Sequence, residues 1–160
     1  MNLLNEIECR ILSRHEFKPK NEIYHLANNV EAILAENILR PKCYGMLSFT
    51  ANPFLTTIFP ETSPRKYRLV LDFKALKRNF GIFPVYYYTE EEFYNAEPYR
   101  WLVKYYVGKG LSIEDVETWN GSIVYVSAGE PMGHESEWKS LKPIEPLDRY
   151  LIRVERIDER

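Results

Sequence analysis

One strong β-strand leads directly into a short helix, and this pair constrains the fold more than any other feature of the sequence. Residues 67–73 (YRLVLDF) are rich in the apolar and aromatic residues that buried strands favour. Asp72 then precedes a helical stretch over residues 74–79, which Gly81 closes. Because strand and helix follow each other with almost no linker, a fold built from one type of element alone is excluded.

Further strands and helices are interleaved along the chain without a regular repeat. Apolar residues at helical spacing predict an amphipathic helix over residues 2–14, and Asn28 or Asn29 can begin a second helix that Pro41 stops. Pro84 places its strand at an edge or a bend. The other segments typical of strands are residues 22–26, 46–50, 82–88, 122–127, 137–141 and 150–155, and those typical of helices are a segment capped by Thr89 and Glu92, residues 99–107 and residues 113–119.

No βαβ rhythm is visible in this order of elements. We therefore predict a single α+β domain over residues 1–160, in which residues 1–20 form an N-terminal helix and linker. A chain of 160 residues is long enough to bury a substantial core.

Charge and cysteine content limit the possible partners. The net charge of −2 argues against a large nucleic-acid surface that ignores sequence, although Lys18, Lys20, Arg65, Lys66 and Arg68 could still form a local basic patch. Cys9 and Cys43 form no CxxC pattern, so we expect buried, reduced thiols and no metal site. The sequence shows no signal peptide and no apolar run long enough for a membrane span, so we expect a cytoplasmic protein without a membrane partner.

Three groups of polar residues stand on or beside predicted strands. His25 lies where a strand enters a helix, and Ser48 and Thr50 lie two apart on the next strand. Glu135 and Glu137 precede the last strand, and we expect one carboxylate to face a cleft and the other to face solvent or a second substrate. Each group also has an ordinary interpretation: a histidine held by a backbone carbonyl, hydroxyls in a strand, and carboxylates on a solvated surface.

The order of these groups resembles the ADP-ribosyltransferase superfamily. The matching segments are Ile23–Leu26 with the helix at 29–39, the Ser/Thr strand at 47–50, and Glu135-Ser136-Glu137-Trp138 followed by a Pro-Leu spacer and a strand. The resemblance is closest to small phage and bacterial members and more distant to the DNA-targeting toxins. It implies a split mixed or antiparallel sheet with flanking helices, NAD as a substrate, and transfer of ADP-ribose to a protein or nucleic-acid acceptor.

The resemblance also implies a role for each matching residue. Glu137 would be catalytic, polarising the ribose 2′-hydroxyl and stabilising an oxocarbenium-like transition state. His25 would hold the adenosine-side ribose, the backbone of Leu26 would meet the nicotinamide amide, and Ser48 and Thr50 would support the nicotinamide ribose. The remaining assignments are Phe54 as the stacking aromatic, with Phe59 and Tyr87 as substitutes, Glu135 as a contact to the acceptor, and Glu97 as a competitor for the catalytic role.

Two other functions remain open. Leu26 stands where the family has a glycine, which favours an inactive binding module that keeps the transferase fold. The aromatic residues and the Arg65, Lys66 and Arg68 patch would instead suit a nucleic-acid-binding or host-takeover protein.

Overall fold

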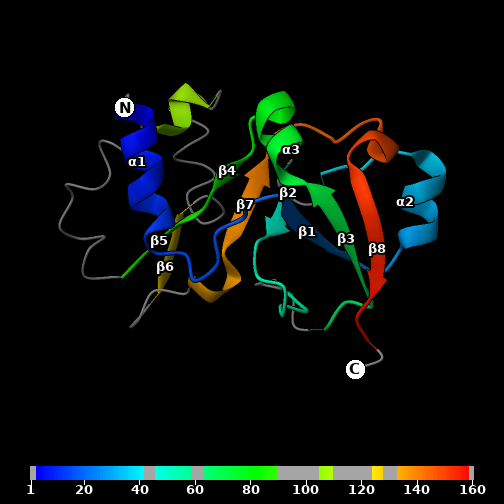
Figure 1. The fold of residues 1–160 in the computed structure, drawn as a ribbon. Helices are drawn as coiled ribbons and strands as arrows, with labels where there is room; N and C mark the ends of the chain where they lie inside the picture. The colour runs from blue at the N-terminus through cyan, green and yellow to red at the C-terminus, as the bar shows by residue number, and fades with distance from the viewer. Residues whose placement is uncertain are drawn as a thin grey trace.

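The protein combines helices with an antiparallel sheet, which confirms the predicted α+β class (Figure 1). The computed structural model describes residues 3–41, 46–58, 63–89, 105–109, 124–127 and 133–158. Its six-stranded sheet has the order β4-β7-β2-β1-β3-β8, and every neighbouring pair is antiparallel. These strands are β4 (Phe83–Pro84), β7 (Glu137–Ser140), β2 (Leu47–Thr50), β1 (Glu22–Ala27), β3 (Tyr67–Asp72) and β8 (Leu151–Arg156).

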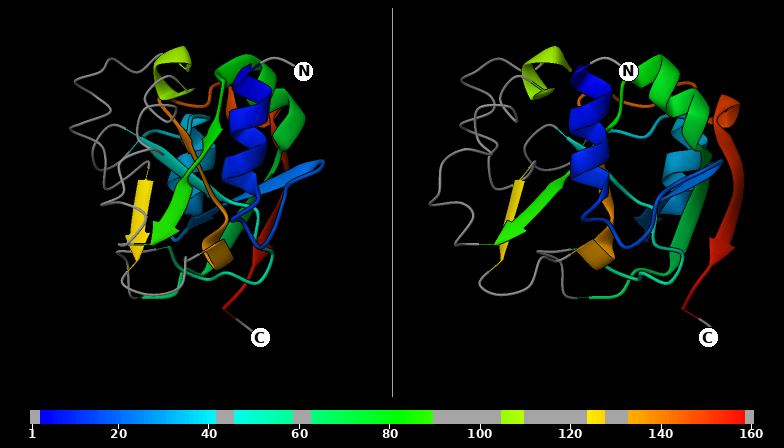
Figure 2. Two further views of the ribbon diagram at one scale, coloured as in Figure 1. Left: turned by 90° about the vertical axis from the view of Figure 1, so that its left-hand side faces the viewer. Right: turned by 60° about the vertical axis from the view of Figure 1, so that its left-hand side comes forward.

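A second, two-stranded sheet lies beside the first. It consists of the parallel strands β5 (Tyr86–Thr89) and β6 (Val124–Ser127). The chain passes from β4 at the edge of the large sheet into β5 of the small one, so Pro84 stands at both the edge and the bend that its chemistry predicts. Helix α1 (Leu3–Leu12) packs against β4 and β5, as the side views show (Figure 2).

Local signals set the ends of the other helices. Helix α3 (Phe73–Phe80) begins at Asp72, whose carboxylate accepts a hydrogen bond from the Ala75 amide at 3.1 Å, and ends at Gly81, where φ is 61°. Helix α2 (Val30–Glu36) ends earlier than predicted, because Asn37 adopts the left-handed conformation that terminates a helix. The expected stop at Pro41 is therefore wrong. The short helical turns η2 (Gly133–Glu135) and η3 (Leu147–Arg149) flank β7 and precede β8.

Some predictions fall outside the described residues. These include the capping box at Thr89 and Glu92, most of the helix at 99–107, of which residues 105–108 are helical, and the helix at 113–119. The apolar spacing of the second helix also predicts that Leu34 is buried, but Leu34 on α2 is 43% exposed. The expected burial of Cys9 is wrong as well, because its thiol is exposed on α1.

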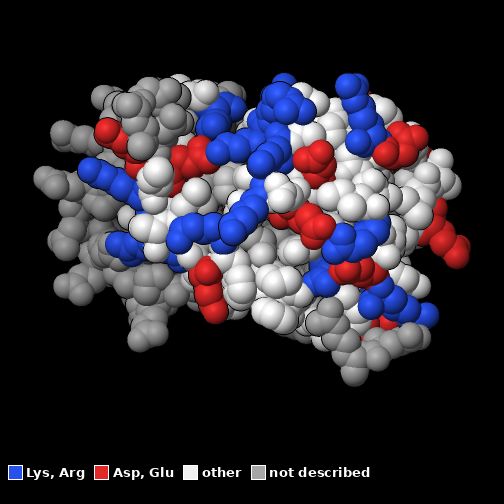
Figure 3. Space-filling view, in the orientation of Figure 1, with Lys and Arg blue, Asp and Glu red and all other residues white. Residues whose placement is uncertain are grey.

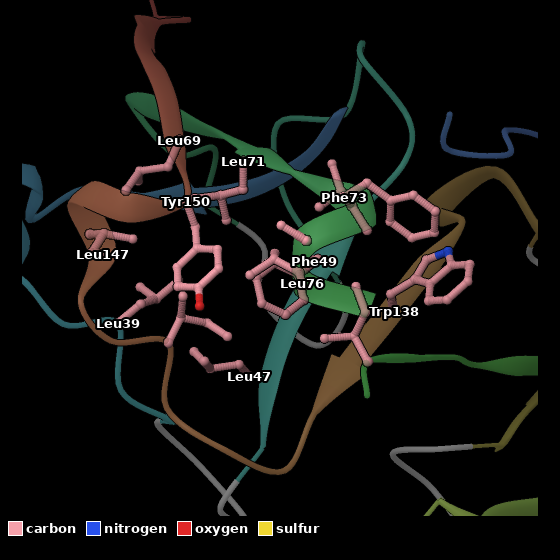
Figure 4. Packing of buried hydrophobic residues seen from close by; sticks show 14 of the residues in the cluster. Leu39, Leu47, Phe49, Leu69, Leu71, Phe73, Leu76, Trp138, Leu147 and Tyr150 are labelled. Carbon is pink, nitrogen blue, oxygen red and sulfur yellow. The ribbon is translucent and has the colours of Figure 1, made fainter. Parts of the chain in front are cut away.

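The large sheet has one apolar face and one polar face. The apolar face packs against α3: the ring centroids of Phe73 and Trp138 are 5.0 Å apart, and Phe49 and Leu76 are fully buried beside them (Figure 4). Side chains directly opposite each other on antiparallel strands share a face. The pairs Ser48–Lys139, Thr50–Glu137, Tyr24–Thr50 and Arg68–Glu155 therefore stand together on the other side, which we call the polar face.

Candidate functional site

The centre of the candidate site is the carboxylate of Glu137 on β7. This strand lies inside the sheet between β4 and β2, and Glu137 is directly opposite Thr50. Only 7% of Glu137 is exposed. Its Oε2 lies 3.1 Å from the ammonium nitrogen of Lys139, which also donates to the Ser48 hydroxyl at 2.7 Å. A buried carboxylate, an ammonium and a hydroxyl therefore meet on the polar face.

Burial dominates the electrostatics of this carboxylate. Loss of hydration raises the pKa of Glu137 to about 7. The charge of Lys139 and hydrogen bonds from Lys139 and Ser48 oppose the rise, and the nearby Glu135 adds to it. Near neutral pH the group is thus divided between its protonated and ionised forms. A carboxyl group in this state is a candidate for acid–base or charge-stabilising chemistry.

The backbone of Glu137 is fixed by the segment that joins the two sheets. The Glu137 amide donates to the phenolic oxygen of Tyr87 at 2.9 Å, and the Val85 amide donates to the Glu137 carbonyl at 2.9 Å. Tyr87 is only 1% exposed, and burial raises the pKa of its phenol, so the ring remains neutral. The position of Glu137 is therefore set by β4 and β5 as well as by its own strand.

Residues 14–17, which we call the N-terminal strap, hold the turn that precedes Glu137. The Glu16 amide donates to the Gly133 carbonyl at 3.0 Å, and the Phe17 amide donates to the Ser136 hydroxyl at 2.9 Å. A Cβ atom on Gly133 would lie 1.9 Å from the backbone oxygen of Arg14. Only glycine fits there without moving the strap, so close packing of backbone on backbone requires this residue.

His15 in the strap is a buried histidine that stays neutral. Its Nε2 lies 2.6 Å from the Val85 carbonyl and therefore carries the proton, since a carbonyl can only accept. Its Nδ1 is buried without a hydrogen-bond partner, and the ring centroid lies 5.0 Å from that of Tyr87. Burial lowers the pKa of His15 to about 4, and the charge of Lys18 contributes in the same direction.

Three of the predicted site residues are brought together. Ser48, Thr50 and Glu137 share the polar face on adjacent strands. The Thr50 hydroxyl donates to the Glu135 carbonyl at 2.5 Å and accepts from the Asn52 amide at 3.0 Å. Thr50 thus ties the end of β2 to the turn before Glu137, a role that the hydroxyl pair in the sequence does not reveal.

His25 is not on this face. It is directly opposite Leu69 across β1 and β3, its ring packs edge-on against Phe49 at 6.0 Å, and its Nδ1 lies 2.8 Å from the Ser48 carbonyl. Side chains alternate along a strand, so the apolar face carries His25 while the polar face carries Glu137. The ring is held by a backbone carbonyl, as in the ordinary interpretation, and its contact with ribose stays a prediction. Leu26 does lie on the polar face, opposite Arg68.

The remaining predicted residues have mixed surroundings. Phe54 is 71% exposed, and its ring meets the edge of Phe17 at 6.0 Å. Glu135 is only 5% exposed, so both the expected solvent-facing carboxylate and a solvated surface for this pair are wrong. Phe59, Glu97 and Cys43 lie outside the described residues.

Sequence reasoning missed two residues of this site. Lys139 stands two positions after Glu137 on a predicted strand, and this spacing alone places both side chains on one face. His15 gives no such signal, because its partner Val85 is 70 positions away.

Within the described ranges, no three His, Cys, Asp or Glu side chains are grouped so that they could hold a metal ion. No helix in the described part of the chain is long and apolar enough to cross a membrane. No family model, curated protein or solved structure matches the chain.

Proposed function

We propose that the protein is an NAD-dependent mono-ADP-ribosyltransferase in which Glu137 is the catalytic carboxylate. The observation that carries this proposal is the buried Glu137 beside Ser48, Thr50 and Lys139 on the polar face. The order of the motifs in the sequence supplies the substrate class, and the geometry supports a carboxylate whose charge is screened little by water.

The proposed reaction uses the ionised form of Glu137. The carboxylate accepts a hydrogen bond from the ribose 2′-hydroxyl and stabilises positive charge on the anomeric carbon. The bond from this carbon to the nicotinamide nitrogen breaks, and nicotinamide leaves with the electron pair. A nucleophilic N–H or O–H group of the acceptor then bonds to the anomeric carbon, and its proton passes to solvent. The Ser48 hydroxyl lies on the same face to contact the ribose, whereas the buried Thr50 hydroxyl holds the turn before Glu137.

Transfer of label from NAD tests this function. Purified protein is incubated with NAD labelled in the adenylate portion and with separated protein, DNA and RNA fractions. We expect label in one fraction, release of nicotinamide, and a loss of at least about 100-fold in Glu137→Gln, as for removal of an electrostatic stabiliser. The matched control is Glu145→Gln, which changes an exposed glutamate and should retain full activity.

Two outcomes count against the proposal. Undiminished transfer by Glu137→Gln would remove this residue from catalysis. Binding of NAD in calorimetry without nicotinamide release would instead favour the inactive binding module, for which Leu26 on the polar face is the motivating residue.

Nucleic-acid binding is the second candidate, and a band of basic side chains favours it. Figure 3 shows Lys and Arg side chains gathered across the side of the molecule that faces the viewer, including the region of α3. Lys74 and Arg78 on α3 are exposed, as are Lys18 and Lys20, and the Phe73 amide binds the Asn21 carbonyl at 3.0 Å, which joins the two segments. Arg68 is not part of this band, because it is buried and paired with Glu155 at 2.5 Å.

Salt titration of oligonucleotide binding tests this candidate. We expect affinity for a labelled single-stranded oligonucleotide to fall steeply with salt, and the slope to become shallower in a Lys74→Glu/Arg78→Glu variant. Lys142→Glu, a charge reversal at an exposed lysine after β7, is the control. Affinity that is independent of salt, or equal in both variants, would exclude the basic band as a nucleic-acid surface.

A further inference from the structure

Lys139 is fixed at two points on the polar face. Its ammonium donates to the Ser48 hydroxyl at 2.7 Å and lies 3.1 Å from Glu137 Oε2, and its side chain is only 12% exposed. Ser48 is directly opposite Lys139 in the register of β2 and β7. A long, flexible side chain is thus held in one place next to the candidate catalytic carboxylate, at a considerable loss of side-chain entropy.

On the described elements, the other groups that we find beside the Glu137 carboxyl carry no positive charge. Glu135 on η2 is a second acid, Tyr87 on β5 is a neutral phenol, and Ser48 and Thr50 on β2 carry hydroxyls. Among these neighbours on the described elements, Lys139 is the cation. A buried carboxylate is stabilised in its ionised form by such a partner.

We propose that Lys139 is the positioning residue that favours the ionised form of the Glu137 carboxyl and holds it on the polar face, with Ser48 as the anchor of its ammonium. Its catalytic meaning rests on the function proposed above, whereas the effect on Glu137 itself does not. Lys139 acts through Glu137 and does not touch the substrate.

The lysine has a second conceivable use, which the same geometry opposes. An ammonium on this face could bind a substrate phosphate directly. In that case its removal would raise the KM for NAD at every pH. The Lys139 ammonium instead contacts Ser48 and Glu137 at short distances. On removal of Lys139 we therefore expect kcat to change at low pH and KM to change little.

Carboxyl NMR titration of Glu137 tests the proposal without any enzymatic turnover. We expect the titration midpoint of Glu137 to move up by at least about one pH unit in Lys139→Met, because an opposite charge within 4–6 Å shifts a carboxyl by about 1–3 units. Lys139→Arg should restore most of the original midpoint. Lys142→Met, at an exposed lysine just beyond the strand, should leave the midpoint unchanged.

Lys139→Gln keeps the question decidable if Lys139→Met does not fold. Glutamine also carries no charge, so the midpoint should move up as in Lys139→Met. An unchanged midpoint in both variants, or in every folded one, overturns the proposal.

Transfer assays then connect this effect to catalysis. In Lys139→Met the acidic limb of the pH–rate profile should move up with the NMR midpoint, and the rate should approach the parent value at high pH. If the Glu137 midpoint shifts in Lys139→Met but the parent protein never consumes NAD, the proposed effect of Lys139 on Glu137 stands and only the proposed function is overturned. A raised KM at all pH values would overturn the positioning role.

Discussion

Replacing Glu137 by glutamine is expected to stabilise the protein by about 3 kcal/mol at pH 8 while removing its proposed activity. Burial raises the pKa of the Glu137 carboxyl from 4.5 to about 7 in the folded state. Each tenfold change in a protonation constant is worth about 1.4 kcal/mol, so ionisation weakens the folded state by about 3 kcal/mol relative to the unfolded chain. Glutamine has the shape of the protonated acid and carries no charge at any pH.

The sign of this effect depends on pH. Between pH 4.5 and about 7 the folded protein binds more protons than the unfolded chain, so the stability contributed by Glu137 falls as pH rises. Urea unfolding of both proteins at pH 4.5 and pH 8 measures the effect. The difference between Glu137→Gln and the parent should be small at pH 4.5 and fully developed at pH 8. A difference in unfolding free energy that is the same at both pH values would mean that Lys139 already compensates for the burial of Glu137. The control Glu145→Gln should have the same unfolding free energy as the parent at both pH values.

Replacing His15 by glutamine is expected to remove a loss of stability of about 3 kcal/mol on acidification. Burial lowers the pKa of His15 from 6.5 to about 4, so between these values the unfolded chain binds more protons than the folded one. Stability contributed by the neutral ring is therefore present above pH 6.5 and is lost as pH falls towards 4. A glutamine amide can still donate to the Val85 carbonyl, but it does not titrate.

Unfolding free energies at pH 7 and pH 4 measure this second effect. The parent should lose about 3 kcal/mol more than His15→Gln over this interval. The control is His134→Gln, which replaces an exposed histidine and should follow the parent. Equal losses in His15→Gln and the parent would show that His15 accepts a proton in the folded protein.

The two groups give opposite slopes over the same pH range. Glu137 destabilises the protein as pH rises and His15 stabilises it, so their contributions offset each other between about pH 4.5 and 6.5. The free energy of unfolding of the parent can therefore change little with pH even though both groups titrate. The single variants separate them.

Elements with local signals could be predicted from the sequence. Helix α3 has a capping carboxylate at Asp72 and a left-handed glycine at Gly81, and both act within a few residues. Strands β1, β2, β3 and β8 have continuous β-prone composition and were found within two residues of their observed ends. Helix α2 ends before the stop that Pro41 predicts, because Asn37 comes first and asparagine tolerates positive φ.

The candidate site could be predicted only in part. Nothing in the sequence places β7 next to β2, and this pairing brings Ser48 to Lys139. The position of His25 was recoverable, since it alternates with the same parity as the buried Ile23 and Ala27. The contacts of the N-terminal strap cannot be predicted from the sequence, because they depend on the path of the backbone between distant segments.

The order of the strands also affects how the sheet is made during synthesis. Strands β1, β2 and β3 can pair soon after they are translated, but the other neighbour of β2 is β7, and Lys139 and Ser48 are 91 positions apart. Until β7 emerges, β2 presents an open row of amide and carbonyl groups to its surroundings. A nascent chain therefore passes through a stage in which another unfinished copy can add a strand at this edge, and docking of β7 ends that stage.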